Sequence, residues 1–245
     1  MVFSSLSLLR GEPYHLNDKI TIYQPTIGDI EKFGETEYYG VASLITAVPY
    51  DFKVPLDDAG IDYEEVSDFE LFRANASNIT PEQTKLIFGE NFNLSNFSEC
   101  ISPKTEQCVL YDEKTDTVID EVVYLTIVEY VRKIHYWERN NKRAGNKRTK
   151  EFLIDEERQK LKMQGDNFKD VNMLEPLITS LVNCRDFKYS YSECWDLTVY
   201  QLLNSYMQIQ TFLNYNNLAT GIYTGNIELD SKIKRDFNWV KKSGD

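Results

Sequence analysis

The sequence predicts a mainly helical α+β fold with a small β-hairpin or ribbon element near residues 93–118. Three observations support this. Several segments repeat apolar residues at the spacing of one helix face, and helix-start signals precede many of them. Only the segment around 93–118 combines short apolar runs with turn residues. The chain is 42% hydrophobic and 27% charged, as in ordinary globular proteins, so we expect a substantial core.

The N-terminal half reads as a short strand followed by short helices. Residues 19–23 alternate around Ile20 and Ile22, and Pro25 ends the strand. Residues 36–48 carry apolar side chains at helical spacing. Thr26 with Asp29 marks a short helix start, although Glu or Gln would be the better partner at 29. Two stronger pairs have the sequence of a capping box, in which each side chain bonds the other residue's backbone: Ser67 with Glu70, and Thr80 with Gln83.

The β element is expected from two apolar runs and a turn. "NFSECI" (96–101) and "CVLYD" (108–112) have the composition of strands, and "DEKTD" (112–116) that of a turn leading toward Val118. These segments predict a hairpin or ribbon.

The clearest amphipathic helix precedes a basic stretch. Its apolar residues recur at the 3.6-residue period: Ile119, Val122, Val123, Ile127, Tyr130, Val131 and Ile134. After residue 172 the pattern is again helical. Thr198 and Gln201 form a capping box for a long helix whose expected core face is Val199, Leu202, Leu203, Tyr206 and Leu213.

Charge divides the chain into regions of opposite sign. Residues 1–131 contain 8 basic against 24 acidic residues, whereas residues 132–245 contain 19 against 15. We therefore expect an acidic N-terminal region (1–131, short helices and the β element, ending in the amphipathic helix), a basic linker (132–150) and a helical C-terminal region (151–245). The opposite signs favour docking within the molecule or two differently charged faces.

The basic residues of the linker allow three interpretations. They are Arg139, Lys142, Arg143, Lys147, Arg148 and Lys150. A phosphate-binding loop is excluded because Gly145 stands alone, whereas such loops need several glycines before Lys-Ser/Thr. A solvated loop joining two helices is favoured, with Asn146 or Thr149 capping the second helix. Nucleic-acid contact and docking onto an acidic protein surface remain open. The acidic stretch at 56–70 is interpreted as a solvated face, with a partner-binding face as the alternative.

No residue pattern points to catalysis. The cysteines and the two histidines, His15 and His135, are not clustered as zinc ligands are, and no nucleophile-elbow motif occurs. His135 is interpreted as a surface residue or a satisfied interface residue. We therefore predict a protein that is not an enzyme, with no catalytic, cofactor-binding or metal-binding residues, no small-molecule substrate and no membrane span. The net charge of −12 disfavours binding to nucleic acid.

The long C-terminal helix is the predicted partner-binding element. Opposite its expected core face it carries four further apolar residues, Tyr200, Met207, Ile209 and Phe212. Aromatic and methionine side chains are enriched at protein interfaces, so these four are the candidate partner-binding residues. The alternative is a helix buried on both sides within a bundle.

Three segments carry a family resemblance: "TIYQPTIGDIEKFGETEYY" (21–39), "DEVVYLTIVEYVRKIHYWERNNKRAGNKRTKEFLIDEER" (120–158) and "LTVYQLLNSYMQIQTFLNYNNLATGIYTG" (197–225). In this ordered set the chain resembles proteins encoded in the tail-morphogenesis region of phages and prophages of Gram-positive bacteria. Such proteins are described as tail assembly chaperones or tail-associated structural proteins. The resemblance transfers no catalytic residue.

The resemblance implies two functions. The first is a chaperone-like assembly factor, present in the host cytoplasm during assembly, that binds a tail component such as the tape-measure protein. The second is a permanent virion subunit of the tail, connector or baseplate. The implied partners are phage tail proteins, namely tape-measure, tail-tube or baseplate components, and a homo-oligomer is left open.

Overall fold

The structure, a computed structural model, describes residues 3–103, 105–164, 172–228 and 238–240. It confirms the α+β, mainly α fold. The described elements of the N-terminal part are α1 (Ser5–Leu9), β1 (Tyr14–His15), β2 (Thr21–Ile22), α2 (Ile27–Phe33), α3 (Glu35–Thr46), η1 (Pro49–Phe52), α4 (Lys53–Asp58), α5 (Asp68–Ala76), α6 (Pro81–Phe88) and η2 (Leu94–Asn96). Strands β1 and β2 pair antiparallel.

Side-chain caps explain where the short helices begin. At Thr26, Ser67 and Thr80 the side chain accepts a hydrogen bond from the backbone N–H three residues on. The side chain of that later residue in turn accepts a hydrogen bond from the backbone N–H of Thr26, Ser67 or Thr80. These reciprocal bonds satisfy N–H groups that a helix start leaves open. The two predicted capping boxes are thus confirmed, and the helix start predicted at Thr26 has the same reciprocal bonds.

The predicted β element is a three-stranded antiparallel sheet. Its strands β3 (Ser98–Ile101), β4 (Cys108–Asp112) and β5 (Thr117–Ile119) pair in sequence order. Asp112 side-chain oxygens accept bonds from the Lys114 N–H and the Thr115 hydroxyl, which closes the predicted turn between β4 and β5. The prediction near 93–118 is confirmed, with a third strand.

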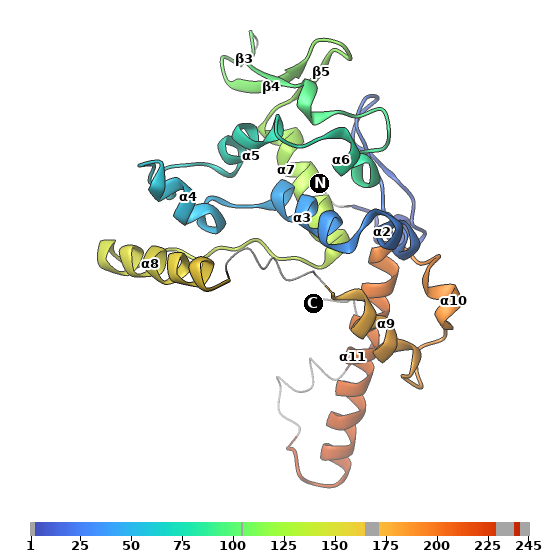
Figure 1. Cartoon of the computed structure of the whole chain (residues 1–245). Helices are drawn as coiled ribbons and strands as arrows, with labels where there is room; N and C mark the ends of the chain where they lie inside the picture. Colours follow the sequence, from blue (N-terminus) through green and yellow to red (C-terminus); the bar gives the residue numbers. More distant parts are fainter. Residues whose placement is uncertain (1–2, 104, 165–171, 229–237, 241–245) are drawn as a thin grey trace.

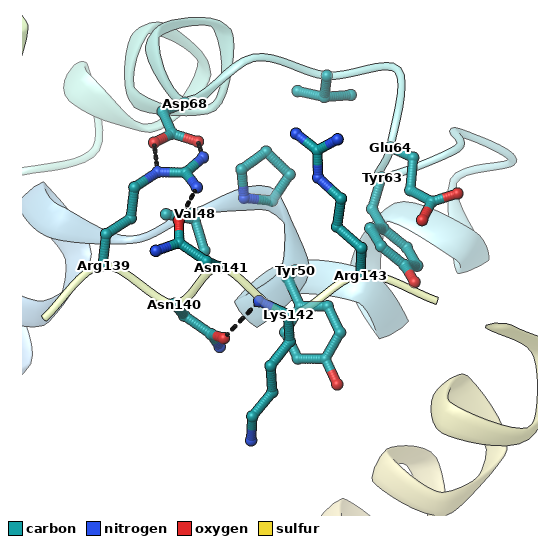
Figure 2. A pocket seen from close by; sticks show the side chains of 12 residues that line it. Val48, Tyr50, Tyr63, Glu64, Asp68, Arg139, Asn140, Asn141, Lys142 and Arg143 are labelled. Carbon is teal, nitrogen blue, oxygen red and sulfur yellow. Dashed lines mark hydrogen bonds and ion pairs between the residues drawn. The ribbon is translucent and has the colours of Figure 1, made fainter. Parts of the chain in front are cut away.

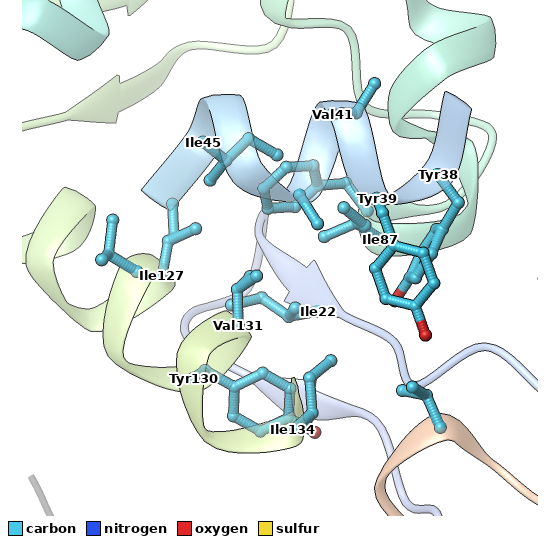
Figure 3. Packing of buried hydrophobic residues seen from close by; sticks show 14 of the residues in the cluster. Ile22, Tyr38, Tyr39, Val41, Ile45, Ile87, Ile127, Tyr130, Val131 and Ile134 are labelled. Carbon is cyan, nitrogen blue, oxygen red and sulfur yellow. The ribbon is translucent and has the colours of Figure 1, made fainter. Parts of the chain in front are cut away.

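Helix α7 (Glu121–His135) is the centre of the core. Figure 3 shows α3 lying across it, with side chains from both helices and from β2 interlocking. The apolar residues Ile127, Val131 and Ile134 are fully buried there. The buried face predicted for this helix is wrong at its start, because Ile119 belongs to β5 and Val122 is 68% exposed.

Helix α8 (Lys147–Gln164) follows an extended segment and packs on α4. Its Ile154 joins Val54 and Tyr63 in a small apolar cluster separate from the main core. Asn146 caps α8 by accepting a bond from the Thr149 N–H at 2.9 Å, and Glu156 pairs with Lys160 one turn on.

The C-terminal part consists of α9 (Leu174–Val182), α10 (Tyr191–Cys194) and α11 (Val199–Tyr223). Helix α11 starts against the body and extends away from it, so its far end and the β3–β5 sheet lie at opposite ends of the molecule (Figure 1). A 25-residue helix is roughly 37 Å long, so much of α11 lies beyond the helices that hold its start.

Candidate partner-binding surface

The start of α11 is joined to the N-terminal region by backbone hydrogen bonds. The N–H groups of Ile27 and Gly28 donate to the carbonyls of Leu197 and Trp195, at 2.8 and 2.9 Å, and the Val199 N–H donates to the Pro25 carbonyl at 3.1 Å. The predicted box of Thr198 and Gln201 is present. Because these bonds link distant segments, they fix the direction in which α11 leaves the body.

Tyr200 lies in the core, which corrects its assignment to a free surface. Its side chain is 4% exposed and stacks on the Tyr136 ring, with centroids 5.5 Å apart. The Tyr136 hydroxyl in turn donates to Asn204 at 2.7 Å. Residue 200 faces inward because the β-bridge between Thr26 and Thr198 sets the rotation of the first turn.

The other three predicted residues are half-buried. Ile209 packs against the main core, and the Phe212 ring meets Trp239 edge-on, with centroids 5.4 Å apart. Met207 has intermediate exposure. The structure therefore gives Tyr200 a core role and leaves Met207, Ile209 and Phe212 only in part accessible.

The accessible apolar residues of α11 include two from its expected core face. Tyr206 is 37% exposed, Leu213 is 43% exposed, and Tyr223 near the helix end is 88% exposed. Val199 and Leu202 are buried as expected. The predicted core face is thus correct for the first turn and wrong further along, because the helix leaves the body there. We define Tyr206, Leu213 and Tyr223 as the α11 surface.

The absence of charged residues also distinguishes α11 in the sequence, and hydrophobic periodicity does not reveal this feature. From Leu197 to Ile227 the chain has no Asp, Glu, Lys, Arg or His, although 27% of the whole protein is charged. Hydroxyls and amides take the polar positions instead, and the Thr211 and Thr220 hydroxyls bond carbonyls one turn back, at 2.9 and 2.8 Å. Such a surface loses water at lower cost than a charged one.

Basic residues of the linker and of α8 bind the acidic stretch at 56–70. Arg139 donates two parallel hydrogen bonds to the Asp68 carboxylate, both at 2.9 Å, and Figure 2 shows the two groups facing each other. Lys150 pairs with Asp62 and Glu64, and Arg158 pairs with Asp57 and Asp58. The acidic stretch is therefore largely an internal docking face for the basic residues that follow α7.

Exposure along the linker is uneven. Lys142, Arg143, Lys147 and Arg148 are exposed, as expected of a solvated loop, whereas Lys150 is half-buried over the Tyr63 ring at 4.6 Å. Residues 132–135 still belong to α7, which ends when Tyr136 takes a left-handed conformation at φ 56°. Arg139 and residues 140–143 also line a hollow of about 360 Å³ with Tyr50 and Tyr63.

His135 is a satisfied interior residue. It is 3% exposed and stacks on Trp137, with ring centroids 4.5 Å apart. Its Nδ1 lies 2.7 Å from the Val131 carbonyl and its Nε2 lies 2.9 Å from the Tyr38 hydroxyl. A carbonyl only accepts, so Nδ1 carries the proton and Nε2 accepts from Tyr38. Burial lowers the pKa of His135 to about 4, so the ring is neutral at pH 7.

Two further properties of the described residues concern membrane spanning and metal binding. None of the helices that the structure describes has the length and hydropathy needed to span a membrane. Among the same residues, no three His, Cys, Asp or Glu side chains gather as metal ligands do.

Fold and surface together define a mainly helical protein whose distal helix projects an uncharged, partly apolar surface. Residues 164–244, which contain α9, α10 and α11, match the family model described as YomV second domain. YomV is a Bacillus prophage gene, so the match is to a phage-associated family and is consistent with a phage protein. No curated protein and no solved structure matches the chain.

Proposed function

We propose that this protein is a non-enzymatic, chaperone-like assembly factor that binds a phage tail component, such as the tape-measure protein, in the host cytoplasm. The observation that carries the proposal is the α11 surface, which is apolar, free of charge and directed away from the body. The match of residues 164–244 to a phage-associated family supports it, because α11 lies inside the matched segment.

The chemistry of the α11 surface suits protein binding. Tyrosine offers a large apolar ring with few rotatable bonds and a hydroxyl that can bond a partner, so its burial is favourable and specific. Tyr206 already receives a hydrogen bond from Gln210 at 3.2 Å, which restricts the position of the ring while leaving it 37% exposed. With Leu213 two turns further on, the helix presents apolar side chains along a single face.

Affinity capture tests the proposal. The tagged protein, produced together with the tail proteins of its phage, should retain a tail component. The double variant Tyr206→Ser/Leu213→Ser should lose most of it, since each buried apolar side chain contributes roughly 1.5–3 kcal/mol. A control, Val122→Ser/Ile101→Ser, removes two apolar residues that lie elsewhere and are even more exposed, 68% and 64%, and should bind normally.

Two results would argue against the proposal. The wild-type protein could retain no tail component, or the α11 variant and the control could bind alike. Mass spectrometry of purified virions distinguishes an assembly factor from a permanent subunit. An assembly factor is absent from virions, whereas a stoichiometric copy number would identify the protein as part of the tail, connector or baseplate.

A further inference from the structure

A second surface lies between the N-terminal helices and the segment that precedes α11. It is a groove of about 290 Å³ lined by Glu31, Glu35, Leu174, Glu175, Ile178, Thr179, Tyr191 and Trp195. None of these residues belongs to α11, and the groove has no part in the proposed function. We call it the α9–α10 groove.

The walls of the groove are held by hydrogen bonds. The start of α9 has no side-chain cap of its own; instead, one carboxylate oxygen of Glu35 accepts the N–H bonds of Met173 and Leu174, at 2.6 and 3.0 Å. On the other wall the Trp195 carbonyl accepts the Gly28 N–H. The Tyr191 hydroxyl accepts from Asn183 at 3.2 Å. The groove is therefore formed before any partner arrives.

The floor and the aromatic wall are suited to apolar contact. Leu174 and Ile178 are buried at the base of the groove. Tyr191 and Trp195 remain 49% and 43% exposed, although large aromatic side chains are usually well buried. Their rings can accept an aliphatic side chain, or a cation above the ring face.

The rim carries charge of one sign only. Glu31, Glu35 and Glu175 line the groove together with no basic residue, and in the part of the chain that the structure describes none of them forms an ion pair. Three carboxylates beside an apolar floor attract a cation and repel an acidic segment. The aromatic wall and the acidic rim thus both favour a basic side chain.

We propose that the α9–α10 groove binds a segment of a partner protein in which Lys or Arg residues flank aliphatic residues. The aliphatic side chain contacts Leu174 and Ile178. The basic groups lie against the Trp195 and Tyr191 rings and pair with Glu31 and Glu175. Glu35 is already bonded to the start of α9 and serves chiefly to hold the wall.

Fluorescence anisotropy with three labelled peptides tests the proposed chemistry. The peptide GKLLKG should bind the full-length protein, whereas the charge-reversed GELLEG and the apolar-deficient GKSSKG should bind at least about tenfold more weakly, given the usual value of surface ion pairs and buried side chains. Raising the salt concentration to about 0.5 M should weaken GKLLKG, because exposed ion pairs are screened.

Charge reversal at the rim tests the location. Glu31→Lys/Glu175→Lys changes two exposed side chains and should weaken GKLLKG by about tenfold, whereas Glu65→Lys, an exposed acid outside the groove, should leave it unchanged. Circular dichroism checks that the variants fold. Trp195→Ala should weaken binding as well, through lost apolar contact.

The proposal is overturned by any of three results. These are no binding of GKLLKG, equal binding of the three peptides, and binding of GKLLKG to the rim variant as tight as to Glu65→Lys. Sedimentation of the rim variant adds one further outcome. A changed oligomeric state would mean that the groove holds a second copy of this chain, and the partner proposal would then be wrong. None of these measurements depends on the α11 surface.

Discussion

His135 couples the stability of the core to pH. Its pKa is about 4 in the folded protein, below the 6.5 of an unperturbed histidine, because burial disfavours the charged ring. Below 6.5 the unfolded chain binds a proton that the folded protein does not. The contribution of His135 is thus fully present above that pH, decreases as the pH falls toward 4, and changes no further below it.

Unfolding in urea at two pH values measures this effect. Between about pH 7 and about pH 5 the free energy of unfolding should fall by on the order of 2 kcal/mol through His135 alone. His135→Gln should lose most of this dependence. His15→Gln alters an exposed ring that is hydrogen-bonded to Thr21, and this variant should retain the dependence. If both variants retain the full dependence, the proposed cause is wrong.

The two neighbouring tyrosines of α11 should respond differently to truncation. Tyr200→Ala removes a buried ring stacked on Tyr136 and should lower the free energy of unfolding by roughly 3 kcal/mol. Tyr206→Ala removes a side chain that is 37% exposed and should cost less than about 1 kcal/mol. Chemical denaturation of both variants measures the difference, and equal losses would contradict the rotation described for α11.

Among the elements, the contact between α1 and α11 depends on a glycine. Gly11 has φ 69°, and a Cβ there would lie 2.9 Å from the Thr198 methyl carbon. Gly11→Ala should therefore cost roughly 1–2 kcal/mol of stability, from backbone strain and from displacement of the α11 start. Gly145→Ala is the matched control, because nothing lies within 4 Å of its Cβ position. Similar melting temperatures for the two variants would show that the contact between Gly11 and Thr198 does not require a glycine.

The ion pairs at the ends of the basic linker should protect it from proteolysis. Trypsin should cut first among Lys142, Arg143, Lys147 and Arg148, which are exposed and lie between α7 and α8 or in the first turn of α8. Arg139→Ala/Lys150→Ala removes the bonds to Asp68, Asp62 and Glu64, so cleavage there should become several times faster. Lys162→Ala, outside the linker, should leave the rate unchanged. Equal rates would show that the ion pairs do not hold the linker.

Local signals predicted element starts better than helix faces. The boxes at Thr26, Ser67, Thr80 and Thr198 act within three residues, so they can be recognised in the sequence alone. Helix α11 carries apolar residues all around, so periodicity could not show which side faces the body. That choice depends on the pairing of residues 25–28 with 195–199, which are distant in the chain. The candidate residue Tyr200 was misplaced for this reason.

At the scale of the whole molecule, the charge asymmetry favoured either docking within the molecule or two differently charged faces. The structure shows internal docking, in the ion pairs of Arg139, Lys150 and Arg158. The acidic partner of each basic residue depends on the fold and could not be predicted from the composition. The α9–α10 groove was missed because its residues come from three separate segments.

The same separation of charge sets α11 apart. The acidic and basic residues pair on the body, whereas the projecting helix carries no charge at all between Leu197 and Ile227. We therefore propose that the body provides the folded framework and that α11 binds the tail component.

Site-specific photo-crosslinking in cells that assemble the phage tests this assignment most directly. A benzophenone amino acid at position 213, in place of Leu213, should form a covalent adduct with a tail protein, identified by mass spectrometry. The same group in place of Val122, which is exposed on α7, should not. Crosslinking of a tail protein through position 122 but not through position 213 would contradict the account.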